Sequence, residues 1–218
     1  MQRRQFLTHT GAATLAGLTL SGTMDQALAQ SLPSGPIKLI VGFPPGGGAD
    51  ALARVVAQKL GTLWGQQVIV DNRPGASSTL AAEYAAQQPG DGTVLFLSTI
   101  NSHALAPAVM PKLRYHAERD FAPVALLGLT PNLLITSASS PVKSVKDLIT
   151  YAKASPGKIS YGTVGVGSVT HLLHELLNLE AGINTVHIPF KGAGPAIIGI
   201  IANEAHIASL STVPVMPH

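Results

Sequence analysis

Two glycine-rich stretches contain the residues best suited to binding chemistry. The first runs from Phe43 to Asp50, and the second from Gly165 to His171. Each follows a short apolar run and precedes a stretch of helical composition. A glycine turn at a helix start exposes backbone N–H groups at the positive end of the helix dipole, where a carboxylate or phosphate can bind. Both stretches therefore predict an anion site.

The same residues could instead have purely structural roles. The first stretch also fits a tight turn that needs glycine for positive φ, with Asp50 as a helix N-cap. In the second, Ser168 fits a helix cap and His171 a packed side chain. A nucleotide loop is not predicted, because no Gly-Lys-Ser/Thr is present and Ala51 breaks the Gly-x-Gly-x-x-Gly pattern.

Metal and hydrolase chemistry also lack their patterns. His171, His174 and Glu175 have the spacing His-x-x-His-Glu instead of His-Glu-x-x-His, and no third ligand is evident. Ser168 is not in a Gly-x-Ser-x-Gly elbow, so an exported hydrolase using Ser168 and His171 is the weaker alternative. The sequence predicts no enzyme, no metal and no cofactor.

Composition narrows the class of protein further. Of the 218 residues, 46% are hydrophobic and 11% charged, where soluble domains average roughly 25% charged, so a globular core is expected. The formal charge is +3, with no basic cluster beyond Arg3-Arg4, and nucleic acid is not an expected partner. The absence of cysteine excludes disulfides and thiol chemistry.

The first 29 residues have the organisation of an export signal. Arg3-Arg4 is followed by a mildly apolar stretch from Gly11 to Leu20 and by the small-residue exit Ala27-Leu28-Ala29. The segment Arg3 to Leu7 resembles a twin-arginine signal, and an ordinary secretory signal is the alternative. We expect cleavage after Ala29 and a periplasmic protein.

Short β-rich runs alternate with helical stretches along the remaining chain. We expect strands over 37–41, 68–70, 94–97, 124–127, 133–135, 159–161, 185–188 and 206–210, and helices over 49–60, 80–88, 145–154, 170–181 and 196–202. Ser144 fits the N-cap of the third helix. Alternation at this spacing predicts parallel pairing in open α/β sheets, with ligands at the strand carboxyl ends. The length favours two units, 30–125 and 126–218.

Several ordered segments together resemble the receptors of tripartite tricarboxylate transporters, the Bug family of periplasmic binding proteins. They are Pro44 to Asp50 with Ala53-Arg54, Gly65-Gln66, Val70 to Ala76, Asn101 to Ala104, Asp120 to Val124, Ala154 to Lys158, Gly165 to Ser168 with His171-Leu172, and Pro189 to Gly192. The resemblance implies a type II-like fold: two doubly wound α/β domains with a ligand cleft between them. It also implies a monomer that captures a small organic carboxylate for membrane permease subunits.

The resemblance also implies which residues bind the ligand. Backbone amides of the first glycine loop hold a carboxylate, and the end of the third strand and the second glycine loop complete the pocket. The implied site comprises Phe43, Gly46, Gly47, Gly48, Ala49, Asp50, Ala76, Ser77, Thr99, Asn101, Gly165, Val166, Gly167, Ser168 and His171. For Lys191, a ligand contact and an exposed structural corner are both open.

The chain departs from the family pattern at three places. Ser77-Ser78 stands where the family usually has Gly-Gly, and His206 and Leu210 stand where aspartates are common. The expected ligands are di- or tricarboxylates and aromatic or amino carboxylates. Within this range, the absence of those aspartates favours a carboxylate that has no amino group. Family members also continue for about another hundred residues. An incomplete second domain is therefore expected, and a non-binding remnant is an alternative.

Overall fold

The computed structural model describes residues 32–218, and within them Gly35–His218 form one compact unit that contains every described helix and strand. The predicted export signal and its cleavage site lie outside the described residues. Within 32–218, no helix combines the length and apolar character needed to cross a lipid bilayer.

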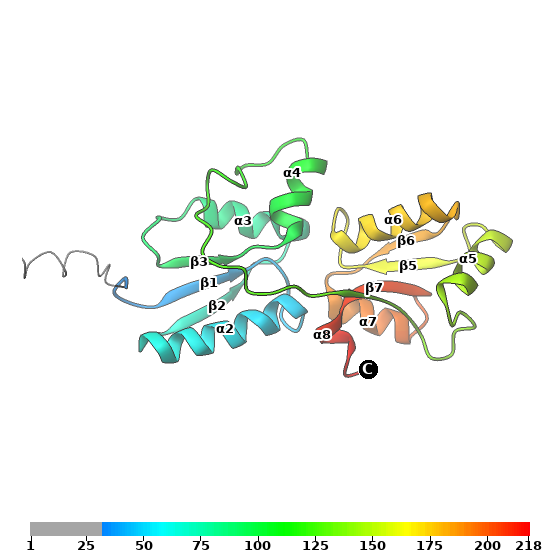
Figure 1. Ribbon diagram of the computed structural model, residues 1–218, viewed down its shortest axis with the longest axis horizontal. Coiled ribbons are helices and arrows are strands. Elements are labelled where there is room, and N and C mark those ends of the chain that lie inside the picture. Colours follow the sequence, from blue (N-terminus) through cyan, green and yellow to red (C-terminus); the bar gives the residue numbers. More distant parts are fainter. Residues whose placement is uncertain (1–31) are drawn as a thin grey trace, which may run out of the picture. The chain divides into compact units, whose positions relative to one another are not determined.

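The first sheet has three parallel strands in the order β2-β1-β3. These strands are β1 (Ile37–Val41), β2 (Val68–Asn72) and β3 (Val94–Leu97). Helix α2 (Gly48–Trp64) covers one face and α3 (Thr79–Ala86) the other (Figure 1). The apolar run Ile37 to Val41 is almost wholly buried because a central parallel strand is covered on both faces. We call this sheet and its helices the first lobe.

The second sheet has the order β4-β7-β5-β6. Its strands are β4 (Asn132–Thr136), β5 (Ser160–Thr163), β6 (Val186–Pro189) and β7 (Ile207–Ser211). Helix α6 (Val169–Ala181) lies on one face and α7 (Ala193–Ile201) on the other, with α5 (Val145–Ala154) and α8 (Thr212–Val215) completing the second lobe (Figure 1). Residues from α7 and β7, including Ile197, Ile200 and Leu210, form its largest buried cluster.

The prediction of parallel pairing is wrong for one strand. β4 runs antiparallel to β7, whereas β5 is parallel to both β6 and β7. A parallel partner requires a crossover connection, usually a helix. β4 follows an extended segment instead of a helix, so the alternation rule does not fix its direction.

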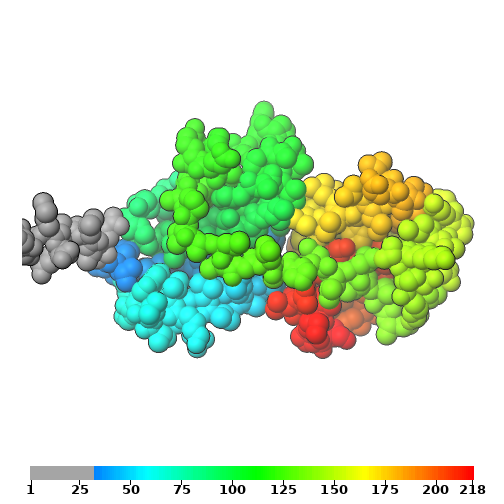
Figure 2. All heavy atoms as spheres, viewed as in Figure 1, coloured from blue at the N-terminus to red at the C-terminus, as the bar shows by residue number. Residues whose placement is uncertain are grey.

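The predicted strand over 124–127 is also absent. Residues 122–131 have no strand pairing, and Val124, Leu126 and Leu129 are more than four-fifths exposed. The segment lies along the surface as a narrow band in Figure 2, at the green part of the colour scale. β-Branched and apolar residues suit a strand only where a neighbouring strand pairs with them.

Other predicted elements are confirmed, with small differences at their ends. β1, β3 and α5 have the predicted bounds, and Ser144 caps α5 by accepting a hydrogen bond from the Asp147 N–H. The short π-helical turn η2 (Asn101–Leu105) and α4 (Ala106–Val109) were not predicted. The N-cap of α2 is Gly47, and Asp50 lies inside the first turn.

A strained turn precedes α3. In the 3-10 turn η1 (Ala76–Ser78), Ala76, Ser77 and Ser78 have φ angles of 43°, 54° and 77°. Left-handed backbone costs a non-glycine residue roughly 1–2 kcal/mol. Ser78 is fully buried against Gly42, where any side chain would collide with it. Gly42 therefore allows the close approach that the turn needs.

Candidate functional site

A cavity of about 200 Å³ lies where strand carboxyl ends and helix starts of both lobes converge. The carboxyl ends of β1, β3, β5, β6 and β7 all lead into it, as expected for ligand sites in open α/β sheets. Its lining is Phe43, Pro44, Pro45, Gly47, Gly48, Ala49, Thr99, Ile100, Asn101, Thr130, Asn132, Val164, Val169, Thr170, Gly192, Ala193, Gly194, Pro195 and Ser211.

The N-terminus of α2 supplies one wall of the cavity. Gly47 is its N-cap, in extended conformation, and no side chain caps the helix. The first N–H groups of a helix have no partner within the helix, and here they belong to Gly48, Ala49 and Asp50. Gly48 and Ala49 line the cavity, so this helix start presents partial positive charge to whatever occupies it.

A buried carboxylate fixes the loop before α2. Asp50 Oδ2 accepts hydrogen bonds from the Gly46 N–H at 3.0 Å and from Arg54 Nε at 2.9 Å, and Asp50 Oδ1 accepts one from Asn72 Nδ2 at 3.0 Å. Burial alone raises the pKa of Asp50, but these hydrogen bonds outweigh it and hold the pKa below its usual 3.8. Asp50 therefore stays ionised at neutral pH and positions the loop from behind.

The N-terminus of α7 lines the cavity from the second lobe. Its N-cap Gly192 has φ 113° and ψ −179°, and no side chain caps the helix. Ala193 and Gly194 leave two N–H groups in the first turn, while Pro195 has none to satisfy. The site list from the sequence omitted this loop. The signal was there in Gly192 and Gly194, which repeat the strand, glycine turn and helix order of residues 43–50.

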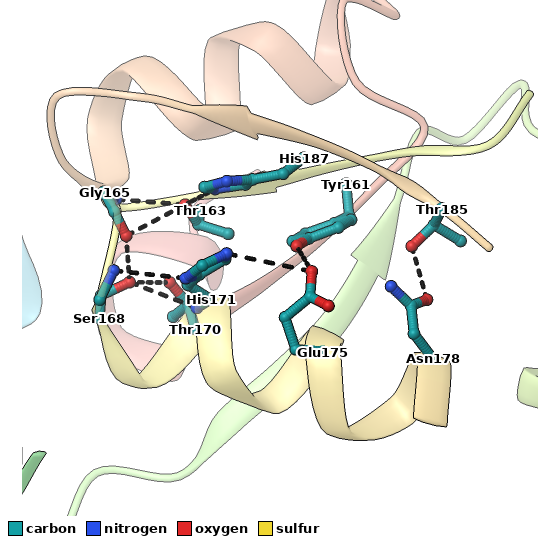
Figure 3. Close-up of polar contacts among 11 residues, drawn as sticks. Tyr161, Thr163, Gly165, Ser168, Thr170, His171, Glu175, Asn178, Thr185 and His187 are labelled. Carbon is teal, nitrogen blue, oxygen red and sulfur yellow. Dashed lines mark hydrogen bonds and ion pairs between the residues drawn. The ribbon is translucent and has the colours of Figure 1, made fainter. Parts of the chain in front are cut away.

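The N-terminus of α6 also reaches the cavity, but side chains cap it. Ser168 Oγ accepts from the His171 N–H at 3.3 Å and donates to the Gly165 carbonyl at 2.7 Å. The Val169 N–H donates to Asn101 Oδ1 of the first lobe at 2.7 Å. Figure 3 shows Ser168 and Thr170 gathered under the loop that starts at Gly165. Of the three helix starts, α6 has the fewest donors left for a ligand.

Histidine rings stack behind this second loop. His171 and His187 lie 4.2 Å apart between ring centroids, and Tyr161 stacks on His174 at 4.5 Å. His171 Nδ1 accepts from the Gly167 N–H at 3.3 Å, and Figure 3 shows the ring's other nitrogen facing Glu175, which accepts a hydrogen bond from Tyr161. The cluster contacts the loop through His171, and none of its rings lines the cavity.

Burial determines the protonation of this cluster. It lowers the pKa of His174 to about 4, with a smaller contribution from His187, and it also lowers the pKa of His187. Burial raises the pKa of Tyr161, and the neighbouring Glu175 carboxylate raises it further. His174 and His187 are therefore neutral at neutral pH, which lets the rings stack without repulsion.

Six of the predicted site residues line the cavity: Phe43, Gly47, Gly48, Ala49, Thr99 and Asn101. The others lie beside or behind the lining: Gly46, Asp50, Ala76, Ser77, Gly165, Val166, Gly167, Ser168 and His171. Whether either group contacts a ligand stays a prediction. The lining residues that the sequence missed come mainly from α7 and from Thr130, Asn132 and Ser211, which follow no recognisable motif.

The cavity lining contains no Asp, Glu, Lys, Arg or His side chain among the described residues. Its donors are backbone N–H groups and the side chains of Thr, Asn and Ser. Thr99 Oγ1 is buried and has no hydrogen-bond partner within residues 32–218. No cluster of three metal-ligating side chains occurs in that part of the chain.

Comparison with known proteins defines the class. Residues 52–218 match the model of the tripartite tricarboxylate transporter family receptor, and the chain belongs to that family. The chain is 36% identical to Protein BugT of Bordetella pertussis over 84% of its own length and 57% of BugT. It therefore spans less than two thirds of this relative.

Solved structures of periplasmic binding proteins have the same fold. The chain is similar to Rpa4515 of R. palustris with adipate, with a TM-score of 0.82, 35% identity, and coverage of 85% of this chain and 62% of that one. It is also similar to MatC of Rhodopseudomonas palustris with bound malate, with a TM-score of 0.79, 30% identity and coverage of 85% and 63%. The type II-like periplasmic binding fold implied by the sequence is confirmed.

Proposed function

We propose that this protein is a periplasmic solute receptor that binds a small organic carboxylate in the cavity between its lobes. The observation that carries the proposal is the pair of uncapped helix starts, at α2 and α7, that face one cavity without a charged side chain. Two N-termini from different lobes suit a ligand with two anionic ends. The adipate and malate of the similar structures are dicarboxylates, which supports this choice.

Energetics require these contacts to act together. A carboxylate at one helix N-terminus gains about 0.3–1 kcal/mol when exposed and about 2 when partly buried, whereas micromolar affinity needs about 8 kcal/mol. Two helix ends and the removal of water from the apolar walls at Phe43 and Val164 are the available contributions. Closure around the ligand is what combines them.

The same lining favours a carboxylate without an amino group. An ammonium group next to the carboxylate would need an acceptor such as Asp or Glu, and the lining offers none. Delivery of the ligand to membrane permease subunits follows from the family and is part of the proposal. Catalysis is not, since Ser168 Oγ is engaged by Gly165 and Thr170 instead of a histidine ring.

Calorimetric titration of the full chain tests the proposal. Adipate and malate should bind, and adipamide, which has adipate's length without its charge, should not. Gly47→Leu should weaken adipate binding at least a hundredfold, because it places a bulky side chain where the α2 amides meet the cavity. Gly90→Leu is the matched control: Gly90 is exposed, far from the lining, and an added Cβ there meets nothing. Equal affinity for adipate and adipamide would contradict the proposal.

A further inference from the structure

Two hydrogen bonds join the first lobe to one short loop of the second. The Ser77 hydroxyl donates to the Val166 carbonyl at 2.8 Å. Three residues further along, the Val169 N–H donates to Asn101 Oδ1 at 2.7 Å. Loop 165–169 is thus held near both of its ends by side chains from η1 and η2. Asn101 is buried, and it also lines the cavity.

The Ser77 contact depends on strained backbone. Ser77 lies in the middle of three consecutive left-handed residues, a conformation that glycine would adopt more easily. In this conformation its hydroxyl reaches the other lobe. Its neighbour Ser78 has the same kind of backbone, but Ser78 Oγ is buried without a hydrogen-bond partner in the described part of the chain. Both serines therefore have strained backbone, but of the two only Ser77 forms a hydrogen bond to the second lobe.

The receiving loop is braced by hydrogen bonds within the second lobe. Thr163 Oγ1 accepts from the Gly165 N–H at 3.2 Å, Ser168 Oγ donates to the Gly165 carbonyl, and His171 Nδ1 accepts from the Gly167 N–H. Figure 3 shows Gly165 between Thr163, at the end of β5, and Ser168, the N-cap of α6. Because these hydrogen bonds tie the loop to β5 and α6, a contact with the loop is also a contact with the body of the second lobe.

We propose that Ser77 and Asn101 form a latch that holds the two lobes closed by binding both ends of loop 165–169. The role of this latch rests on the proposed function: closure brings the N-termini of α2 and α7 together around one ligand. Ser77 is a positioning residue in this account: it does not line the cavity, and it acts through Val166. Its removal should weaken ligand binding without removing any ligand contact.

The chain has no cysteine, so two labels can be placed specifically. Gln58→Cys on α2 and Glu180→Cys on α6 introduce spin labels at exposed positions, one on each lobe. Electron–electron double resonance on the full chain then gives the distribution of label distances without ligand and with adipate. The four backgrounds are the parent chain, Ser77→Ala, Ser77→Gly and the control Ser78→Gly.

The proposal predicts different results for the two serines. Ser77→Ala and Ser77→Gly should both move the ligand-free distribution to longer distances, and should weaken adipate binding about three- to tenfold for one lost hydrogen bond. Ser77→Gly should also raise the melting temperature, because it relieves strain. Ser78→Gly should raise it as well, with unchanged distances and affinity. A residue with a purely structural role would change stability and affinity in the same direction.

Asn101→Asp tests the other half of the latch. An ionised carboxylate accepts more strongly from the Val169 N–H, so the ligand-free distribution should become narrower and shorter. Adipate should nevertheless bind more weakly, because the new charge faces the cavity. Distances that are unchanged in both Ser77 variants and in Asn101→Asp would overturn the latch. If adipate binds none of the chains while the distances still change as described, the proposed function fails and the latch stands.

Discussion

The glycine loops 43–48 and 165–168 are alike in sequence, but they differ in whether the helix that follows keeps free N–H groups. Loop 43–48 leaves the N–H groups of α2 uncapped and facing the cavity, and Asp50 holds it from behind. Loop 165–168 is bound to its own helix by Ser168 and to His171 through Gly167. A glycine turn at a helix start is therefore open to an anion only where no side chain has already taken its donors.

The supports of the two loops also respond differently to acid. Asp50 has a lowered pKa, so its hydrogen bonds persist as the pH falls until that pKa is reached, below 3.8. Behind the second loop, burial lowers the pKa of His174 and of His187, so the unfolded chain takes up these protons at milder acidity than the folded protein does. The first loop should keep its geometry across the range in which the second lobe loses stability.

The largest expected effect comes from removing the support of the first loop. Asp50→Ala removes the acceptor of the Gly46 N–H and of the half-exposed Arg54 and one of the two acceptors of Asn72 Nδ2, and should lower the free energy of unfolding by about 3 kcal/mol. Urea unfolding at pH 7 measures this change in the free energy of unfolding. Asp91→Ala, at an exposed turn where the carboxylate accepts from the Thr93 N–H and hydroxyl, is the control and should have a far smaller effect. Equal losses would show that loop 43–48 needs no such support.

Acidification should weaken the second lobe next. The pKa of His174 is about 4 in the folded protein and 6.5 in the unfolded chain, so the unfolded chain takes up the proton first. Stability is full above pH 6.5 and falls as the pH drops towards 4, by about 2 kcal/mol between pH 7 and pH 5. His174→Phe should flatten this dependence, and His218→Phe at the exposed end should not. The measurement is urea unfolding at several pH values, and a slope that His174→Phe leaves unchanged would refute the assignment.

Helix capping gives a smaller and more selective effect. Ser168→Ala and Ser144→Ala each remove an N-cap hydroxyl and should cost about 1 kcal/mol of stability. Only Ser168→Ala should also weaken adipate binding, by a few fold, because Ser168 braces the loop beside the cavity. Thermal melts and calorimetric titration of both variants separate the two effects. Equal affinity in the two variants would mean that the loop brace is irrelevant to binding.

Lys191 should have the smallest effect. Its side chain is exposed and outside the cavity lining, although it immediately precedes Gly192. Lys191→Ala should change adipate affinity less than twofold at physiological salt, where charges at the surface are screened. A tenfold loss in the same titration would place this ammonium group at the ligand.

Local signals predicted much of this fold. A few neighbouring residues were enough to predict β1, from the apolar run Ile37 to Val41, and the N-cap of α5, from Ser144. β4 and the segment 122–131 were mispredicted because pairing direction and strand formation depend on distant neighbours. At the site, Gly47 to Ala49 could be predicted from glycine and helix position alone. The hydrogen bond from the Val169 N–H to Asn101 could not be predicted, because the two residues are 68 positions apart in the sequence. This contact is one of the features that distinguish the second glycine loop from the first.

The central claim is that the free helix starts of α2 and α7 hold the anion while the start of α6 serves closure. Amide chemical shifts of the ¹⁵N-labelled chain, recorded during titration with adipate, test this directly. The account predicts downfield shifts of the N–H protons of Gly48, Ala49, Ala193 and Gly194 as they gain a charged acceptor. The Gly167 and Val169 amides, which already have partners, should change little. The largest shifts at 165–169, with silent amides at α2 and α7, would contradict it.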